Sequence, residues 1–188
     1  MPAVPWRASA ISLFPILLSA SSLPQLTLEK LVSQSDTIVA GHVVRAWAAM
    51  DSENRFIWTH YEVNVGDVLK GQPQASVVIG EPGGTLNGVS LPVPGSTSYT
   101  VGEEVSVFLY RTPIGYLRTT NYGQGKFVIS ADHRLHSSHA MNIAGAVIAA
   151  DAYRSATGTS VETLDGTTWS DFRSRVARVV AAQKEARR

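Results

Sequence analysis

The most informative absence in this chain of 188 residues is cysteine, of which there is none. Without cysteine the protein has no disulfide bond, no thiolate metal ligand and no thiol nucleophile. Charge is also sparse, since 16% of the residues are charged and the formal net charge is +1. So small a net charge creates no long-range field that would recruit nucleic acid or an anionic membrane. We therefore expect no nucleic-acid partner.

Sequence signatures of catalysis are missing as well. The chain has neither the G-x-S-x-G elbow of serine hydrolases nor the H-E-x-x-H motif of zinc proteases. Its closest approach to a phosphate-binding loop is GQGK at residues 123–126. That match fails, because such a loop leads into a helix and Phe127 here begins an expected strand. We expect a protein that is not an enzyme and that carries no cofactor.

The first 22 residues have the pattern of a signal peptide. Arg7 supplies a positive charge, and residues 8–18 form an apolar run. That run is shorter than the roughly 20 residues that a membrane-spanning helix needs. Small residues follow at positions 19–22, as signal peptidase requires, and we place cleavage near residues 20–22. A buried N-terminal helix is the alternative. The pattern predicts a secreted or periplasmic protein.

Patterns typical of β-strands dominate residues 23–130. Two β-rich runs within residues 36–71, joined by the charged connection DSENR, predict a long antiparallel hairpin. In its second run the residues alternate between two faces, with Ile57, Thr59, Tyr61, Val63 and Val65 on one and Trp58, His60, Glu62 and Asn64 on the other. Further strands are expected at residues 75–80, 105–110, 116–120 and 127–130. Five or six principal strands predict a small antiparallel β-barrel or a sandwich.

The remaining segments are less regular. Thr27 is placed to cap a short helix over residues 28–34. Residues 81–102 are rich in glycine and proline and predict a long loop with a brief edge strand at residues 89–93. Residues 131–167 show no firm period and predict a loose tether. We interpret residues 168–188 as a basic C-terminal helix.

The C-terminal helix carries an apolar stripe of Trp169, Phe172, Val176, Val179 and Val180. We expect this stripe to dock on the barrel, where Trp169 and Phe172 cover an open side. A basic amphipathic helix on anionic lipid or on a partner is the alternative. Apart from that possibility we expect no membrane association.

Six segments together resemble a family of uncharacterised exported bacterial proteins: LTLEKLVSQSDTIVAGHV, YEVNVGDVLKG, GG, VGEEVSVFLYR, GQGKF and WSDFRSRV. The resemblance covers residues 26–179 and implies no activity. More distantly, residues 26–129 resemble the netrin-like domain, the OB-type barrel of tissue inhibitors of metalloproteinases. Those inhibitors use an N-terminal cysteine to meet the catalytic zinc, so their mechanism does not transfer to this chain. The resemblance implies an OB-like barrel and binding to another exported protein.

The candidate binding residues lie in loops, because binding residues on barrels tend to lie in loops on a rigid frame. We select Gly83, Gly84, Gln124 and Lys126 as a binding rim. The alternative is that the glycines supply positive-φ turns.

Histidines 133, 136 and 139 form the pattern H-x-x-H-x-x-H. Histidine is a common metal ligand, but no firm helix is expected there. We favour an exposed polar tether and predict no metal site.

Three other groups of residues are weaker candidates. Ser33, Asp36, His42 and His60 are a possible hydrolytic set, although any chain of this size contains one by chance. Glu81, Glu103 and Glu104 are carboxylates near strand ends, and a glycosidase would need such groups to face one cleft, but we expect them in solvated turns. Trp58, His60 and Lys70 are compatible with the nucleic-acid face of an OB barrel, a reading that the charge balance disfavours. The sequence thus predicts an exported, non-catalytic binding module, with a hydrolase or a structural cell-envelope protein as alternatives.

Overall fold

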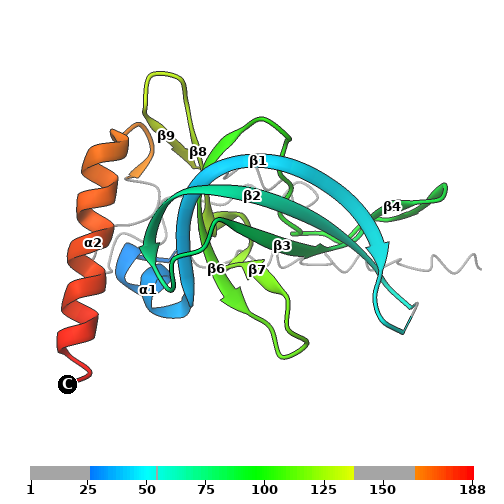
Figure 1. Ribbon diagram of the computed structural model, residues 1–188, viewed down its shortest axis with the longest axis horizontal. Helices are drawn as coiled ribbons and strands as arrows, with labels where there is room; N and C mark the ends of the chain where they lie inside the picture. The colour runs from blue at the N-terminus through cyan, green and yellow to red at the C-terminus, as the bar shows by residue number, and fades with distance from the viewer. Residues whose placement is uncertain (1–25, 54, 138–163) are drawn as a thin grey trace, which may run out of the picture.

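The computed structural model describes residues 26–53, 55–137 and 164–188 (Figure 1). The predicted signal peptide lies outside the described residues. The elements are, in chain order, α1 (Leu28–Gln34), β1 (Thr37–Met50), β2 (Ile57–Lys70), β3 (Ser76–Pro82), β4 (Gly84–Leu86), β5 (Val89–Leu91), β6 (Glu104–Arg111), β7 (Leu117–Thr119), the 3₁₀ helix η1 (Tyr122–Gly125), β8 (Lys126–Ile129), β9 (Leu135–Ser137) and α2 (Trp169–Glu185). The mainly β prediction is confirmed, as are the two expected helices.

Seven strands form one mixed sheet in the order β1-β2-β3-β7-β6-β8-β9, and a further pairing of β1 with β6 closes a ring of five strands. The long hairpin is present as β1 and β2, which pair antiparallel. The expectation of a wholly antiparallel sheet of five or six strands is wrong. β7 returns from β6 and meets β3 in the parallel direction, through the single residue pair Ile79 and Leu117.

Alternation along the strands separates two faces of the ring, as predicted for β2. Tyr61 and Val63 belong to a buried cluster with apolar residues of β1, β3, β6 and β7. Trp58 and His60 lie on the other face. Gly41 marks a register shift in β1, and a Cβ atom there would lie 2.0 Å from the carbonyl oxygen of Asn64. Glycine at this position is therefore required for the strand to coil.

Glu81 bridges the place where β3 and β7 have separated. Its Oε1 accepts a hydrogen bond of 2.8 Å from the backbone N–H of Thr119, and its Oε2 lies 3.4 Å from the Arg118 guanidinium. The side chain is only 2% exposed, so the expectation of a solvated turn is wrong for this residue. Burial raises the pKa of Glu81, against the opposing effects of Thr119 and Arg118.

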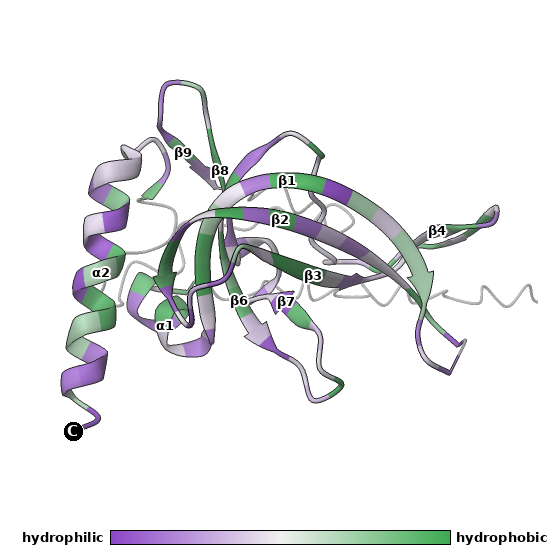
Figure 2. Ribbon diagram, viewed as in Figure 1, coloured by the Kyte–Doolittle hydropathy of each residue, from purple (hydrophilic) through white to green (hydrophobic). Residues whose placement is uncertain are grey.

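A second core lies between the ring and the helices. Phe108 of β6, Phe127 of β8 and Phe172 of α2 are fully buried there and contact one another, with ring centroids 5.1 to 6.1 Å apart. The predicted docking of α2 is therefore confirmed. Figure 2 shows hydrophobic and hydrophilic residues alternating along α2, as expected for a helix with one buried side.

The ends of the predicted tether are folded. β9 pairs with β8, and the backbone N–H of Leu135 donates to the carbonyl oxygen of Thr167. The physical reason is that Leu135 and Leu164 are both fully buried in the second core. The sheet thus extends beyond residue 130, while residues 138–163 lie outside the described residues. Within the predicted loop 81–102, β5 occupies the expected edge strand and pairs with β4, which the sequence did not predict.

Replacing Glu81 by Gln tests the effect of burial on this carboxyl group. Because its pKa is raised above 4.5, the folded state keeps the proton over a pH range in which the unfolded chain has lost it. The free energy of unfolding of the native protein should fall, relative to that of Glu81→Gln, as pH rises from below 4.5 through the raised pKa. Urea unfolding at a series of pH values measures this difference. If the native protein instead became more stable relative to Glu81→Gln as pH rises, Arg118 and Thr119 would outweigh burial.

Replacing Phe172 by Ala tests the docking of α2. Loss of a fully buried aromatic side chain should lower the free energy of unfolding by about 3–5 kcal/mol. Ser174→Ala, on the exposed side of the same helix, should change it by less than about 0.5 kcal/mol. Urea unfolding monitored by circular dichroism gives both values. Equal, small effects of the two substitutions would contradict the packing described here.

Candidate functional site

The candidate site is a cluster of aromatic rings on the outer face of β1, β2 and β3, which we call the aromatic face. Strand register assembles it: Trp47 of β1 lies opposite His60 of β2, and His60 lies opposite Gly80 of β3. One step along, Trp58 lies opposite Ala49. These side chains point away from the core inside the ring, because successive residues of a strand face opposite sides of the sheet.

The rings contact one another in a continuous series. Trp47 stacks on His60 with centroids 5.3 Å apart, and His60 meets Tyr116 edge-on at 5.4 Å. Tyr116 also packs on Trp58 at 4.8 Å, and Trp58 contacts Phe56 at 5.9 Å. Such pairs add stability beyond the area they bury. The series therefore holds its rings in fixed positions.

Two connecting segments complete the aromatic face. Phe56 comes from the β1–β2 connection and Tyr116 from the turn between β6 and β7. Gly80 makes room for Tyr116, since a Cβ atom at residue 80 would lie 3.3 Å from the tyrosine Cγ. The ring of Tyr116 thus rests on the backbone of β3, and the two turns are held against the same sheet.

Positive charge borders the rings. The Arg45 guanidinium lies 4.3 Å from the Trp47 ring centroid and pairs with Glu62 at 3.0 Å. Arg118 approaches the Trp58 ring at 5.9 Å. Both are cation–π contacts, which orient an arginine without consuming its hydrogen-bond donors. The Arg45 side chain is 63% exposed, so its remaining donors face solvent.

His60 is nearly covered, with 9% of its surface exposed. Burial lowers the pKa of His60, because the charged imidazolium is poorly solvated between the rings. The imidazole is therefore neutral at pH 7 and acts as another flat ring in the stack. What this arrangement offers chemically is a rigid aromatic surface edged by an arginine.

The predicted binding rim is not one surface. Gly83 lies between β3 and β4 and Gly84 begins β4, with φ of +91° and +133°, and a Cβ atom on Gly84 would lie 2.2 Å from Thr59 Oγ1. The two glycines supply a positive-φ turn, which was the alternative to a binding role. Lys126 and Gln124 belong to β8 and η1. β4 and β8 are well separated in Figure 1.

Lys126 and Gln124 make internal contacts. Lys126 is 5% exposed; its Nζ donates to Glu103 at 2.6 Å and to the carbonyl oxygen of Ser98 at 2.8 Å. The Gln124 Oε1 accepts a hydrogen bond of 2.8 Å from the backbone N–H of Leu26. The lysine holds the segment before β6 against β8, and the glutamine holds the start of α1.

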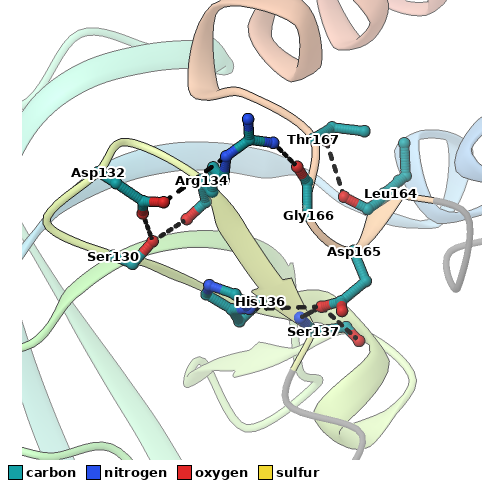
Figure 3. A network of polar contacts seen from close by, with 9 residues as sticks. All are labelled: Ser130, Asp132, Arg134, His136, Ser137, Leu164, Asp165, Gly166 and Thr167. Carbon is teal, nitrogen blue, oxygen red and sulfur yellow. Dashed lines mark hydrogen bonds and ion pairs between the residues drawn. The ribbon is translucent and has the colours of Figure 1, made fainter.

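His133 and His136 of the histidine pattern lie on the β8–β9 hairpin, and Figure 3 shows His136. His133 sits in the turn of this hairpin with φ of +57°, His136 lies on β9, and His139 is outside the described residues. The Nδ1 atom of His136 is 3.9 Å from Asp165. Nothing in the three described ranges brings together three or more His, Asp or Glu side chains that could hold a metal ion.

Figure 3 also shows what the polar residues around this hairpin do. Arg134 donates to the carbonyl oxygen of Gly166 at 2.6 Å, and the backbone N–H of Ser137 donates to Asp165 at 2.8 Å. These contacts fasten β9 to the segment that precedes α2. The network thus positions α2 rather than forming a separate cavity.

The residues considered for hydrolysis make separate contacts. Asp36 accepts from the backbone N–H of Arg111 at 2.7 Å, and Ser33 donates to the carbonyl oxygen of Lys30 at 2.8 Å. His42 is 62% exposed and lies 3.9 Å from Glu104. His60, the fourth, belongs to the aromatic face, so the set does not converge.

Trp58, His60 and Lys70 were the residues compatible with the nucleic-acid face of an OB barrel. The structure brings the first two together and places Lys70 elsewhere. Its Nζ donates to the carbonyl oxygens of Val32 and Ser35, at 2.7 and 2.6 Å, at the end of α1. Burial lowers the pKa of Lys70. Sequence reasoning missed Trp47, which the register of the hairpin could have found, and Tyr116, which no local pattern indicates.

Comparison with protein-family models and with curated proteins gave no match. Neither α1 nor α2, the two described α-helices, is long and apolar enough to cross a membrane.

Replacing His60 by Gln tests the burial of the imidazole. Because the pKa of His60 is lowered from 6.5, the unfolded chain takes up the proton at a higher pH than the folded protein does. The native protein should therefore lose stability relative to His60→Gln as pH falls through 6.5 toward the lowered pKa. Urea unfolding between neutral and acidic pH measures the effect. Identical pH dependence in the two proteins would place His60 outside the ring stack.

Proposed function

We propose that this chain is an exported, non-catalytic module that binds another exported protein, such as a protease, through the aromatic face. The observation that carries the proposal is the composition and rigidity of that face. Tryptophan, tyrosine and arginine dominate the binding energy of protein interfaces. Here Trp47, Tyr116 and Arg45 are held in place before any partner arrives, so little conformational entropy is lost on binding.

The location of the aromatic face supports a finer reading of the fold. We propose that the five-strand ring is an OB-type barrel with a distant similarity to the netrin-like domain. OB folds bind ligands on the face of their second and third strands, between the 1–2 and 4–5 loops. Within this ring β2 and β3 are the second and third strands, and Phe56 and Tyr116 lie in the corresponding loops. The formal net charge of +1 favours a protein ligand over nucleic acid.

The two alternative functions have less support. A hydrolase would need convergent ionisable groups, and Ser33, Asp36 and His42 each have different partners. A structural envelope protein held by its basic tail would use the apolar side of α2, which is packed in the second core.

The proposal predicts that substitutions on the aromatic face abolish capture of a specific partner. The purified chain is immobilised and mixed with the exported proteins of the cells that make it, and bound proteins are identified by mass spectrometry. The native chain should retain a partner that the double variant Trp47→Ala/Tyr116→Ala does not. For that partner, Trp47→Ala alone should weaken binding by about 2 kcal/mol or more in calorimetry.

Val89→Ala provides the matched control, because Val89 is 63% exposed on β5 and takes no part in the aromatic face. It should leave binding unchanged. Trp47→Phe, which keeps a ring opposite His60, should retain most of the affinity. Thermal unfolding of each variant checks that it is folded. The proposal fails if no specific protein is retained, or if the double variant retains the same protein equally well.

A further inference from the structure

α1 and α2 lie at the other end of the molecule from the β1–β2 loop (Figure 1), and residues of both helices line a groove. It consists of two adjoining hollows of about 750 and 440 Å³, which share Glu29, Gln183 and Ala186 as lining residues. We call it the interhelix groove. Leu28 of α1 and Val179 of α2 give the larger hollow an apolar lining. The larger hollow has room for several side chains of a ligand.

Positive charge gathers around the interhelix groove. Arg175 and Arg178 line the larger hollow, and Lys30 and Arg187 line the smaller one. Glu29 is the single acidic residue among those that line the two hollows. Within the described part of the chain, none of these four cations forms an ion pair.

Five other arginines of the described chain are in ion pairs, namely Arg45, Arg55, Arg118, Arg134 and Arg173. Arg173, on the same helix, pairs with Asp67 at 2.7 Å, and Arg45 pairs with Glu62 at 3.0 Å. The cations of the interhelix groove are therefore uncompensated, although they stand beside an apolar floor. An acidic ligand would gain charge-assisted hydrogen bonds there, which are stronger than neutral ones.

Gln183 holds the two helices together at this groove. Its Nε2 donates to the carbonyl oxygen of Glu29 at 2.7 Å. Its Oε1 is buried and has no hydrogen-bond partner among the described residues. A donor on a bound ligand would satisfy this oxygen, and a peptide offers such donors.

We propose that the interhelix groove binds an acidic amphipathic segment of another protein. The apolar side of the segment would cover Val179 and Ala182, and its carboxylates would pair with Arg175 and Arg178. This is the helix-in-groove mode, in which apolar anchors give affinity and charges give specificity. The proposal is independent of the aromatic face.

A lipid surface fits the same observations less well. An interfacial helix buries its apolar side among acyl chains. In α2 that side includes Phe172 and Val176, which are fully buried in the second core. What remains accessible is a small apolar strip, Val179 and Ala182, flanked by charges, and this strip offers acyl chains little area.

The test uses the full chain and a fluorescent peptide as long as α2, with leucines on one side and glutamates on the other. Fluorescence anisotropy should give a Kd on the order of 10 µM, and the same peptide with lysines for glutamates should not bind. Arg175→Glu/Arg178→Glu should weaken binding at least about tenfold, and added salt should weaken it as well. Arg55→Glu/Arg111→Glu changes the net charge equally at other exposed sites and should have no effect.

A second variant separates shape from charge. Ala182→Trp fills the larger hollow without changing charge and should also abolish binding. Circular dichroism confirms that each variant is folded. Three results would overturn the proposal: no binding of the acidic peptide, binding that Arg175→Glu/Arg178→Glu leaves intact, or a dimer in analytical ultracentrifugation that this variant dissociates. It would also fail if vesicles of phosphatidylglycerol and phosphatidylcholine bound the groove arginines and the peptide did not.

Discussion

The ring depends on one carboxyl group, that of Glu81. β3 and β7 share a single pair of residues, so the sheet would be nearly open at that point. Glu81 supplies the missing ladder bond by accepting the N–H of Thr119, while Tyr99 bonds the hydroxyl of Thr119 at 2.5 Å from the other side. The Glu81 carboxyl group thus takes the place of a backbone carbonyl as the hydrogen-bond acceptor. Burying the carboxyl group costs free energy, and its contacts with Thr119 and Arg118 offset part of that cost.

Closure at this seam also explains the aromatic face. The turn between β6 and β7 reaches β3 only because the ring is closed, and this brings Tyr116 onto Gly80 beside Trp58. Arg118 takes part in both features, since it contacts Glu81 and lies near the Trp58 ring. The contacts that close the core and the partly buried rings outside it are therefore parts of one arrangement.

Local chemistry made much of the fold predictable. Period-two alternation identified the two faces of β2, and Thr27 caps α1 as predicted. The features of the fold that could not be predicted from the sequence depend on residues that are distant along the chain. Leu135 and Leu164 lie in stretches without a clear period, yet both are buried in the second core. Glu81 looks like a surface residue until β7 is placed beside it.

The residues of the candidate sites also fall into those that local sequence indicates and those that depend on distant partners. Trp58 and His60 were visible as neighbours on one strand face, whereas Trp47 needed the hairpin register and Tyr116 the ring closure. Lys126 was mistaken for a loop residue because its counter-charge, Glu103, is remote in the sequence. Lysine buried with an acidic partner has the same local sequence as lysine in solvent. Only the assembled chain distinguishes the two.

The two helices lie together at one pole of the molecule, and this has a practical consequence (Figure 1). Arg188 lies just beyond α2, on the side away from the β1–β2 loop. A cargo, surface tether or reporter fused after Arg188 would therefore project from the helical pole and leave the opposite pole unobstructed. The fold could in this way present one end to a support and the other to solution.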